Sequence, residues 1–247
     1  MRMRRGRMLS ARLGVGLAVF FLTLGLGAAF GVARGLRPAL EKLFPERKLI
    51  VRPPSLNVAL LKLQTLHIND ESLAAIRAIP GVARVDPQMP IGFPIHAEGT
   101  LGPTQAEVVT EIVVHGAPRD LVADGIPADE SFEWKMNDSR PCPVVVSSYF
   151  LDLYNLGISE STQLPKLNES ALVGRKFDLV LGESVIVMGA GSGMRKTVTC
   201  SVVGFTRDPN LAGIAIPLEA VRAFNEWYSG SEYVAKYNVV QIEVAST

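Results

Sequence analysis

A glycine-rich segment at residues 189–193, with the sequence GAGSG, is the first place to look for chemistry, because a glycine loop after a strand can cradle phosphate groups. A dinucleotide-binding fingerprint would need its third glycine at the position held by Met194, and a helix after it. Residues 195–200 (RKTVTC) instead alternate as a strand does. The sequence therefore predicts a hairpin loop between two strands and no cofactor-binding site.

Metal ligands are sought among the three histidines, His67, His96 and His115. None has a second histidine at i+4 or a cysteine at the short spacings that metal-binding motifs use. His67 stands close to Asp70 and Glu71, so it is expected at the surface beside a helix cap. The sequence predicts no metal site.

Catalytic groups are not predicted either. Ser184, in the segment GESV, fails the nucleophile-elbow pattern because no glycine stands two positions after the serine. The acidic residues Asp129, Glu130 and Glu133 lie in a polar segment where solvation explains them. Since no nucleophile, base or acid pair emerges, the chain is not expected to be an enzyme.

The two cysteines, Cys142 and Cys200, are the only ones in the chain and stand 58 positions apart. On the far side of a membrane an oxidised pair is one interpretation. The other is that Cys200, in the middle of an expected strand, is a small buried hydrophobic residue. The sequence leaves both interpretations open.

The chain is organised around residues 13–33 (LGVGLAVFFLTLGLGAAFGVA), which are 21 consecutive positions without a charged side chain. A helix of that length rises about 31 Å, close to the roughly 30 Å hydrocarbon core of a bilayer. We interpret the segment as a transmembrane helix. The alternatives are a cleaved secretory signal, whose apolar region is usually about 7–15 residues long, and a buried soluble helix, which would be shorter and striped.

Small residues mark one face of this predicted helix. Gly27 and Gly31 form a small-xxx-small pair on which another membrane helix could pack closely. The alternative explanation is that glycine is simply more frequent in membrane helices. Gly27 and Gly31 are therefore candidate helix-packing residues.

The basic residues favour a cytoplasmic N-terminus. Five arginines and no acidic residue precede residue 13, while residues 34–48 also hold five basic residues but at lower density. Removing the first five from the 25 Lys and Arg of the chain leaves 20, against 24 Asp and Glu, which is a net charge of −4. Nothing in that balance resembles the basic patch of a nucleic-acid-binding domain.

The remaining residues predict a domain of class α+β. Residues 34–48 are expected to be a short stalk, and the proline-rich residues 87–103 a long loop or partly paired hairpin. Helices are expected after Asn69 or Asp70, after Ser147 or Ser148, and from Pro217 to Gly230. The strands are expected at residues 49–51, 58–66, 82–85, 108–114, 144–146, 177–181, 183–188, 194–205, 213–216 and 238–244.

Several segments, in their order after the membrane helix, match a known pattern. They are LAAIRAIPGVARV at 73–85, EIVVHG at 111–116, residues 144–156, LVGR from residue 172, VVGF at 202–205 and IAIPL at 214–218. In this order the chain resembles the periplasmic core domain of MacB-type ABC transporter permeases, the FtsX/LolC/LolE-like superfamily. The resemblance covers nearly the whole chain.

The resemblance implies a cytoplasmic segment at residues 1–12, the membrane helix at 13–33, the stalk at 34–48 and a two-lobed extracytoplasmic domain. One lobe would combine residues 49–110 with 200–247, and an inserted lobe would hold residues 111–199. It also implies a location in the bacterial inner membrane, a cytoplasmic ABC ATPase subunit as partner and a dimeric permease. Such permeases couple ATP-driven helix motion to transport of lipid, lipoprotein, peptide or drug cargo.

The sequence departs from the family pattern in one respect. The family has three further membrane helices after the outer domain, and this sequence ends at Thr247. We therefore expect the N-terminal part of a permease subunit. The alternative is a membrane-anchored extracytoplasmic binding or adaptor protein that works without an ATPase.

Overall fold

A computed structural model describes residues 48–58, 61–64, 67–101, 106–159, 166–186, 193–230 and 233–245. The predicted membrane helix, with Gly27 and Gly31, and residues 34–47 of the stalk lie outside the described residues. In the part of the chain that is described, no helix is long and apolar enough to cross a membrane. Residues Leu49–Thr247 form one compact unit, separate from Met1–Lys48.

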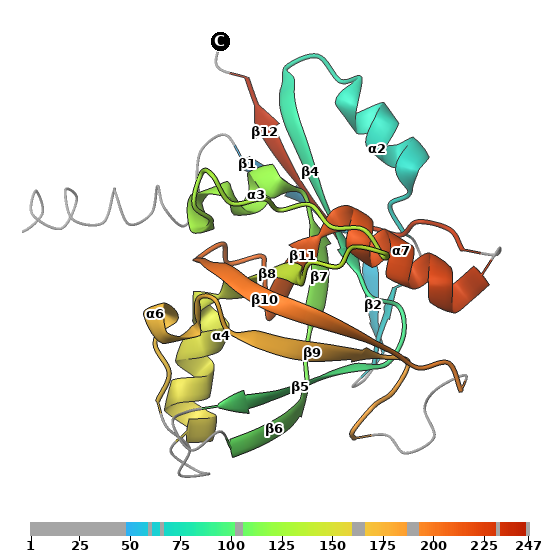
Figure 1. Cartoon of the computed structure of the whole chain (residues 1–247). Coiled ribbons are helices and arrows are strands. Elements are labelled where there is room, and N and C mark those ends of the chain that lie inside the picture. The colour runs from blue at the N-terminus through green and yellow to red at the C-terminus, as the bar shows by residue number, and fades with distance from the viewer. Residues whose placement is uncertain are drawn as a thin grey trace, which may run out of the picture. The chain divides into compact units, whose positions relative to one another are not determined.

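One mixed sheet of ten strands runs through this unit in the described residues (Figure 1). Its order is β1-β12-β4-β7-β11-β8-β10-β9-β5-β6, and the pairs β7/β11 and β8/β10 are parallel. In Figure 1 β12 and β4 run steeply whereas β10, β9 and β5 run across, so the sheet is strongly twisted. The strands are β1 (Lys48–Val51), β4 (Val82–Pro90), β5 (Ile95–Leu101), β6 (Ala106–Glu111), β7 (Val114–Ala117), β8 (Cys142–Ser147), β9 (Lys176–Leu181), β10 (Lys196–Thr206), β11 (Ile214–Pro217) and β12 (Val239–Val244).

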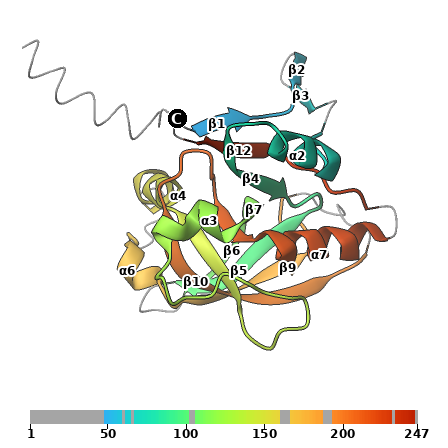
Figure 2. The same cartoon turned by 90° about the horizontal axis from the view of Figure 1, so that it is seen from above.

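Short helices and one hairpin complete the unit. Helix α2 lies beside β4 in both views (Figures 1 and 2), and α7 packs on β4, β7 and β11. The helices are α2 (Asp70–Arg77), α3 (Arg119–Val122), η1 (Ala123–Gly125), α4 (Ser148–Leu153), η2 (Tyr154–Ile158), α6 (Glu169–Leu172) and α7 (Leu218–Ser229), and the hairpin is β2 (Ser55–Val58) with β3 (Leu61–Gln64).

Apolar side chains are buried on both faces of the central strands. In β8, Val144 and Val146 belong to the main core, whereas Val145 belongs to a second, smaller core with Leu121 and Phe132. Successive side chains of a strand point to opposite faces, so burial on both faces explains why β8 and β11 are continuous apolar runs.

Helix α7 follows its sequence signals closely. Pro217 stands at its N-cap, and Gly230, with φ of 66°, ends it. The buried side of α7 contacts β7 at Gly116, where an added Cβ would lie 2.8 Å from the Cβ of Val221. Glycine at residue 116 therefore sets how closely the helix approaches the sheet.

Most expected elements are confirmed, as is the α+β class. Helix α2 begins after Asn69, whose side chain accepts a hydrogen bond of 2.9 Å from the Ser72 amide. Strands β9 and β10 are antiparallel, with Lys196 opposite Leu181. The chain between Leu181 and Lys196 thus joins two antiparallel strands, and residues 189–192 of the predicted loop lie outside the described residues.

Several expected boundaries are wrong. Residues 87–103 are mostly strand, because β4 continues to Pro90 and β5 begins at Ile95. At Pro87, β4 is paired with β12 only, because its pairing with β7 involves Met89 and Pro90. The amide hydrogen that proline lacks therefore interrupts no strand pairing on the other side of β4. The expected strand at 108–114 divides between β6 and β7, and residues 183–186 form no strand.

Two other expectations concern longer stretches. Residues 58–66 were expected as one extended segment, but β2 ends at Val58 and β3 begins at Leu61, antiparallel to it. The division into lobes at 49–110 plus 200–247 and 111–199 stays a prediction. Backbone hydrogen bonds cross that boundary, since β5 pairs with β9.

Replacing Gly116 tests the helix–sheet contact. We expect Gly116→Ala to lower the free energy of unfolding by about 1–3 kcal/mol, because the new methyl group overpacks the contact with Val221. Gly157→Ala is the matched control, since an added Cβ there meets nothing within 4 Å. Thermal unfolding of both variants measures the difference, and equal melting temperatures would contradict the close approach.

Candidate functional site

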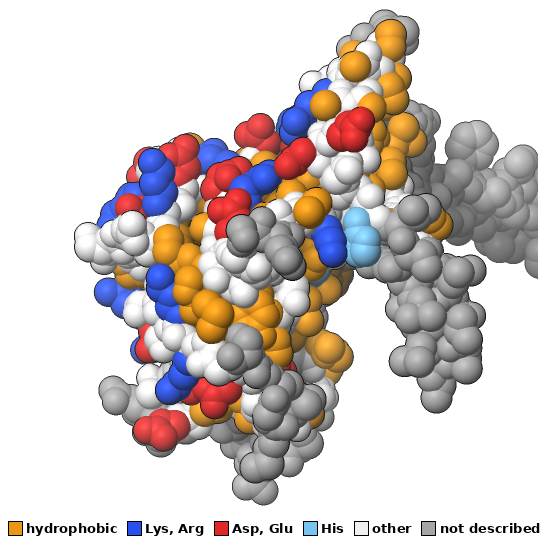
Figure 3. All heavy atoms as spheres, turned by 90° about the vertical axis from the view of Figure 1, so that its right-hand side faces the viewer, with side chains coloured by type: hydrophobic (Ala, Val, Ile, Leu, Met, Phe, Trp, Pro, Cys, Tyr) orange, Lys and Arg blue, Asp and Glu red, His pale blue; other side chains and the backbone are white. Residues whose placement is uncertain are grey.

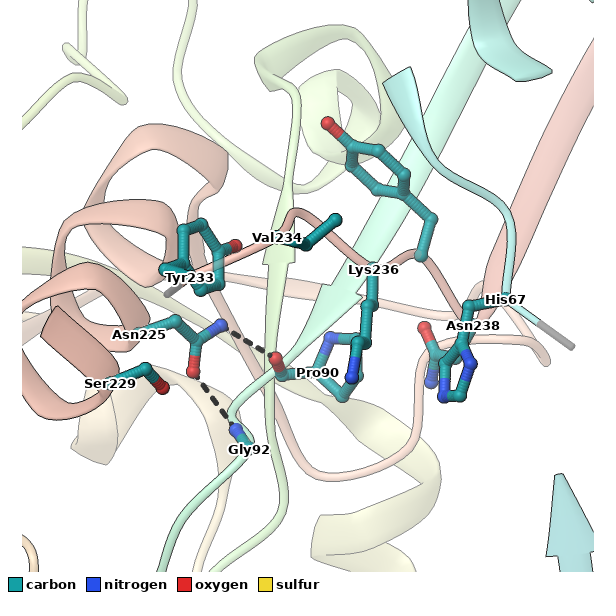
Figure 4. A pocket seen from close by; sticks show the side chains of 10 residues that line it. His67, Pro90, Gly92, Asn225, Ser229, Tyr233, Val234, Lys236 and Asn238 are labelled. Carbon is teal, nitrogen blue, oxygen red and sulfur yellow. Dashed lines mark hydrogen bonds between the residues drawn. The ribbon is translucent and has the colours of Figure 1, made fainter. Parts of the chain in front are cut away.

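A pocket of about 370 Å³ opens between the C-terminal half of α7, the end of β4 and the segment that leads into β12 (Figure 4). Asn225 and Ser229 lie on one side of it and His67 and Asn238 on the other. The lining residues are His67, Pro90, Gly92, Asn225, Ser229, Tyr233, Val234, Lys236, Tyr237 and Asn238.

Asn225 fixes the wall of this pocket. Its side chain is 5% exposed, donates to the Pro90 carbonyl at 3.0 Å and accepts from the Gly92 amide at 2.9 Å (Figure 4). Strand β4 ends at Pro90, so the side-chain amide of Asn225 supplies hydrogen bonds to the backbone where the strand pairing stops. The wall of the pocket formed by Pro90 and Gly92 is therefore hydrogen bonded to α7.

The lining mixes apolar and polar side chains, and its described residues include no carboxylate. Lys236 gives it a positive charge, and the buried Asn238 Oδ1 has no hydrogen-bond partner among the described residues. Such a recess can hold a small polar or anionic group by hydrogen bonds and charge. Its described residues include no nucleophile hydrogen bonded to a base.

A charged network next to the pocket joins three segments. The Tyr237 hydroxyl donates to Asp70 Oδ1 at 2.6 Å, and Arg222 donates to both the Tyr237 hydroxyl, at 2.6 Å, and the Asp70 carboxylate. These bonds from Arg222 and Tyr237 lower the pKa of Asp70. Burial and the bond to Asp70 raise the pKa of Tyr237, which is 1% exposed. The network fastens α2 to α7 and to the segment before β12.

A second cluster surrounds His96 on β5. Its Nε2 lies 2.9 Å from Glu98 Oε1, and its Nδ1 lies 3.1 Å from the Glu183 carbonyl. Both partners carry acceptor oxygens, so the site suits an imidazole that donates from both ring nitrogens, which is its protonated form. Burial lowers the pKa of His96, but the bonds and charges of Glu98 and Glu183 outweigh it and the pKa is raised. Arg195 completes the cluster by pairing with Glu183 at 3.0 Å.

Ser184, the serine considered as a nucleophile, has a structural contact. Its hydroxyl donates to Glu111 Oε1 at 2.6 Å, and the Val185 amide donates to the same oxygen at 2.7 Å. Burial raises the pKa of Glu111, but these hydrogen bonds more than offset it and the pKa is lowered. Glu111 therefore anchors the segment that follows β9 to the edge strand β6.

The other predicted positions are dispersed. Within the described ranges, no group of three or more His, Cys, Asp or Glu side chains could hold a metal ion. His67 lines the pocket, and His115 is on β7, where burial lowers its pKa. Cys142 and Cys200 are brought together on neighbouring strands. Gly27 and Gly31 lie outside the described residues.

Sequence reasoning did not single out Asn225, Arg222 or Tyr237. Asn225 gives a usable signal, because it stands four positions after Val221 on the buried side of a helix. The partners Arg222 and Tyr237 stand 152 and 167 positions from Asp70. No local pattern reports contacts over such separations.

Residues 53–247 match the model of the PCD-like family, described as "Probable transporter periplasmic core domain". The chain belongs to this family. Among solved structures, it is similar to the extracellular domain of the noncanonic ABC-type transporter YknZ from Gram-positive bacteria, with 12% identity, 73% of this chain and 75% of that chain covered, and a TM-score of 0.36. It is also similar to the periplasmic region of MacB from Actinobacillus actinomycetemcomitans, with 7% identity, 81% and 74% covered, and a TM-score of 0.39. No curated protein matches the sequence.

The family match confirms the resemblance expected from the sequence. It covers the pocket, the Asp70 network and the His96 cluster, which all lie within residues 53–247. The chain therefore carries a transporter periplasmic core domain.

The His96 cluster predicts a dependence of stability on pH. Because the folded pKa is raised above 6.5, protonated His96 stabilises the fold fully below about pH 6.5, and this contribution is lost as the pH rises through the folded pKa. Urea unfolding of the full chain in detergent between pH 6 and 9 should show this loss. His96→Gln should flatten it, whereas His67→Gln, at an exposed histidine, should not. A wild-type stability that rises over this range relative to His96→Gln would contradict the assignment.

The Asp70 network predicts a second effect on stability. Tyr237→Phe removes one hydroxyl that donates to a carboxylate, so we expect a loss of about 1 kcal/mol and a melting temperature lower by roughly 2–4 °C. Tyr149→Phe, at an exposed tyrosine of α4, is the control and should change little. Calorimetry checks both variants, and an unchanged melting temperature for Tyr237→Phe would show that the network contributes nothing.

Proposed function

We propose that this chain is the N-terminal part of an ABC transporter permease subunit. Residues 13–33 cross the bacterial inner membrane with the N-terminus in the cytoplasm, and the extracytoplasmic domain couples ATP-driven helix motion to the movement of a lipid, lipoprotein, peptide or drug cargo. The family match over residues 53–247 carries the proposal. The partners are a cytoplasmic ABC ATPase, further permease helices and a second permease subunit.

The arrangement of the sheet supports a mechanical role. Strand β1 begins the described chain and β12 ends it, and the two are neighbours at one edge of the sheet. A force applied to the segments before β1 and after β12 therefore reaches the same edge. Hydrogen bonds between successive strands then transmit it towards β6 at the other edge.

The side-chain contacts support the same role. The Asp70 network and the Asn225 bonds tie α2, α7 and the end of β4 to one another, so these parts move together. The face that carries α7 shows hydrophobic side chains gathered between charged ones (Figure 3). Trp227 and Tyr228 of α7 are half-buried there beside Phe93. An apolar face of this kind suits contact with apolar cargo or a partner domain.

We do not assign this chain a reaction of its own. Ser184 and His96, two residues with groups that catalysis could use, are hydrogen bonded to Glu111 and to Glu98. In the proposed transporter, ATP hydrolysis belongs to the cytoplasmic subunit.

Purification of the full chain from native membranes tests the proposal. We expect an ATPase with a phosphate-binding loop to co-purify in stoichiometric amount. A Gly27→Leu and Gly31→Leu double variant should reduce this recovery at least several-fold, because bulky side chains block close helix packing. Gly14→Leu with Gly16→Leu, on the same predicted helix, is the control and should retain the partner.

The outcomes separate the proposal from its alternative. A chain that is recovered from membranes without any ATPase would favour the anchored binding or adaptor protein. Equal recovery for both double variants would leave residues 13–33 as a plain anchor. A cofactor-loaded enzyme would contradict both functions.

A further inference from the structure

The two cysteines of the chain stand opposite each other in the sheet. Cys142 on β8 and Cys200 on β10 are paired Cα positions of two parallel strands. Adjacent strands lie about 4.8 Å apart, and disulfides join α-carbons separated by about 4.4–6.8 Å. The strand register therefore holds the two residues at a separation that a disulfide can bridge.

Both side chains also point to the same face. Cys142 and Cys200 belong to the main core together with Val144 and Val146, whereas Val145, between those two valines, points to the second core. Each cysteine is 0% exposed, and both are thiols in this structure. The neighbouring Cys142 side chain, followed by burial, raises the pKa of the Cys200 thiol.

We propose that Cys142 and Cys200 form a disulfide that joins β8 to β10 in the exported protein. The inference uses the extracytoplasmic location given by the family and does not rest on the transport mechanism. No third cysteine exists in the chain to compete for either thiol.

The reaction is a thiol–disulfide exchange with a disulfide-bearing oxidant of the extracytoplasmic space. One cysteine thiolate attacks the oxidant disulfide, forms a mixed disulfide and releases one oxidant thiolate. The second cysteine thiolate then attacks the protein sulfur of the mixed disulfide and releases the other. Two electrons pass from the cysteines to the oxidant, and the two protons lost by the cysteines end on its sulfur atoms.

Burial determines when this exchange takes place. Both thiols are fully buried, and a buried thiol is out of reach of an oxidant, so the attack precedes the docking of β10 beside β8. After docking, the same burial shields the bond from reductants. The disulfide is thus a structural one, made once during folding.

The bond lies at a junction of the sheet. Strands β10, β9, β5 and β6 follow one another on one side of it, and β8 with the five strands beyond it lies on the other. The register of β8 and β10 shifts between Val202 and Gly204, so the pairing is irregular just after Cys200. A covalent link beside this irregularity would hold the two parts of the sheet together.

Alkylation of the full chain, purified from membranes without reductant, tests the proposal. The chain is denatured with iodoacetamide and analysed by mass spectrometry. We expect no adduct, one peptide pair linked through Cys142 and Cys200, and two adducts after prior reduction. Two adducts without reduction would overturn the proposal.

A thermal double-mutant cycle gives a second measurement. If the bond exists, Cys142→Ala and Cys200→Ala each lower the melting temperature by on the order of 10 °C, and the double variant loses little more than either. Losses that simply add would overturn the proposal. Val144→Ala is the matched control: it creates a cavity in the same strand, so it should lower the melting temperature while remaining free of adducts in the alkylation assay.

Discussion

Backbone pairing between segments far apart in sequence is the constraint on which the rest of this structure depends. Strand β12 pairs with β4, placing Val240 opposite Pro87, and β10 pairs with β8 in parallel. Parallel and long-range pairs need crossover connections, which here are occupied by the helices and polar segments between the strands. This sheet determines where α7 packs on Gly116 and where Asn225 bonds the end of β4 at the pocket. It also places the two cysteines next to each other.

Charged side chains secure the segments that the sheet does not hold. Asp70, Arg222 and Tyr237 join α2, α7 and the approach to β12, while His96 and Glu111 hold the residues that follow β9. In each case a group with few backbone bonds gains charge-assisted side-chain bonds. These ionisable residues have a structural use. It explains the presence of the titratable side chains that would otherwise be the first candidates for catalytic residues.

In the proposed function, the domain transmits movement. The first described strand, β1, and the last, β12, are neighbours, and each strand of the sheet is hydrogen bonded to the next. Asn225 also ties the end of β4 to α7. Such a body can move as one piece. A ligand or partner that binds in the pocket beside α7, or on the apolar face that carries α7, would be affected by that movement. The proposed disulfide would add a covalent tie at the parallel junction.

The sequence by itself determined the apolar segment 13–33, the α+β class, the capping of α2 by Asn69 and the extent of α7, because these follow from local hydrophobic period and turn residues. Its order of motifs also predicted the family. Only the tertiary structure decided that β4 continues to Pro90 and β5 begins at Ile95, that Asp70 meets Tyr237 and that Cys142 stands opposite Cys200. The physical reason is that strand register and partner choice are set by contacts across more than 50 positions, and no local pattern encodes them.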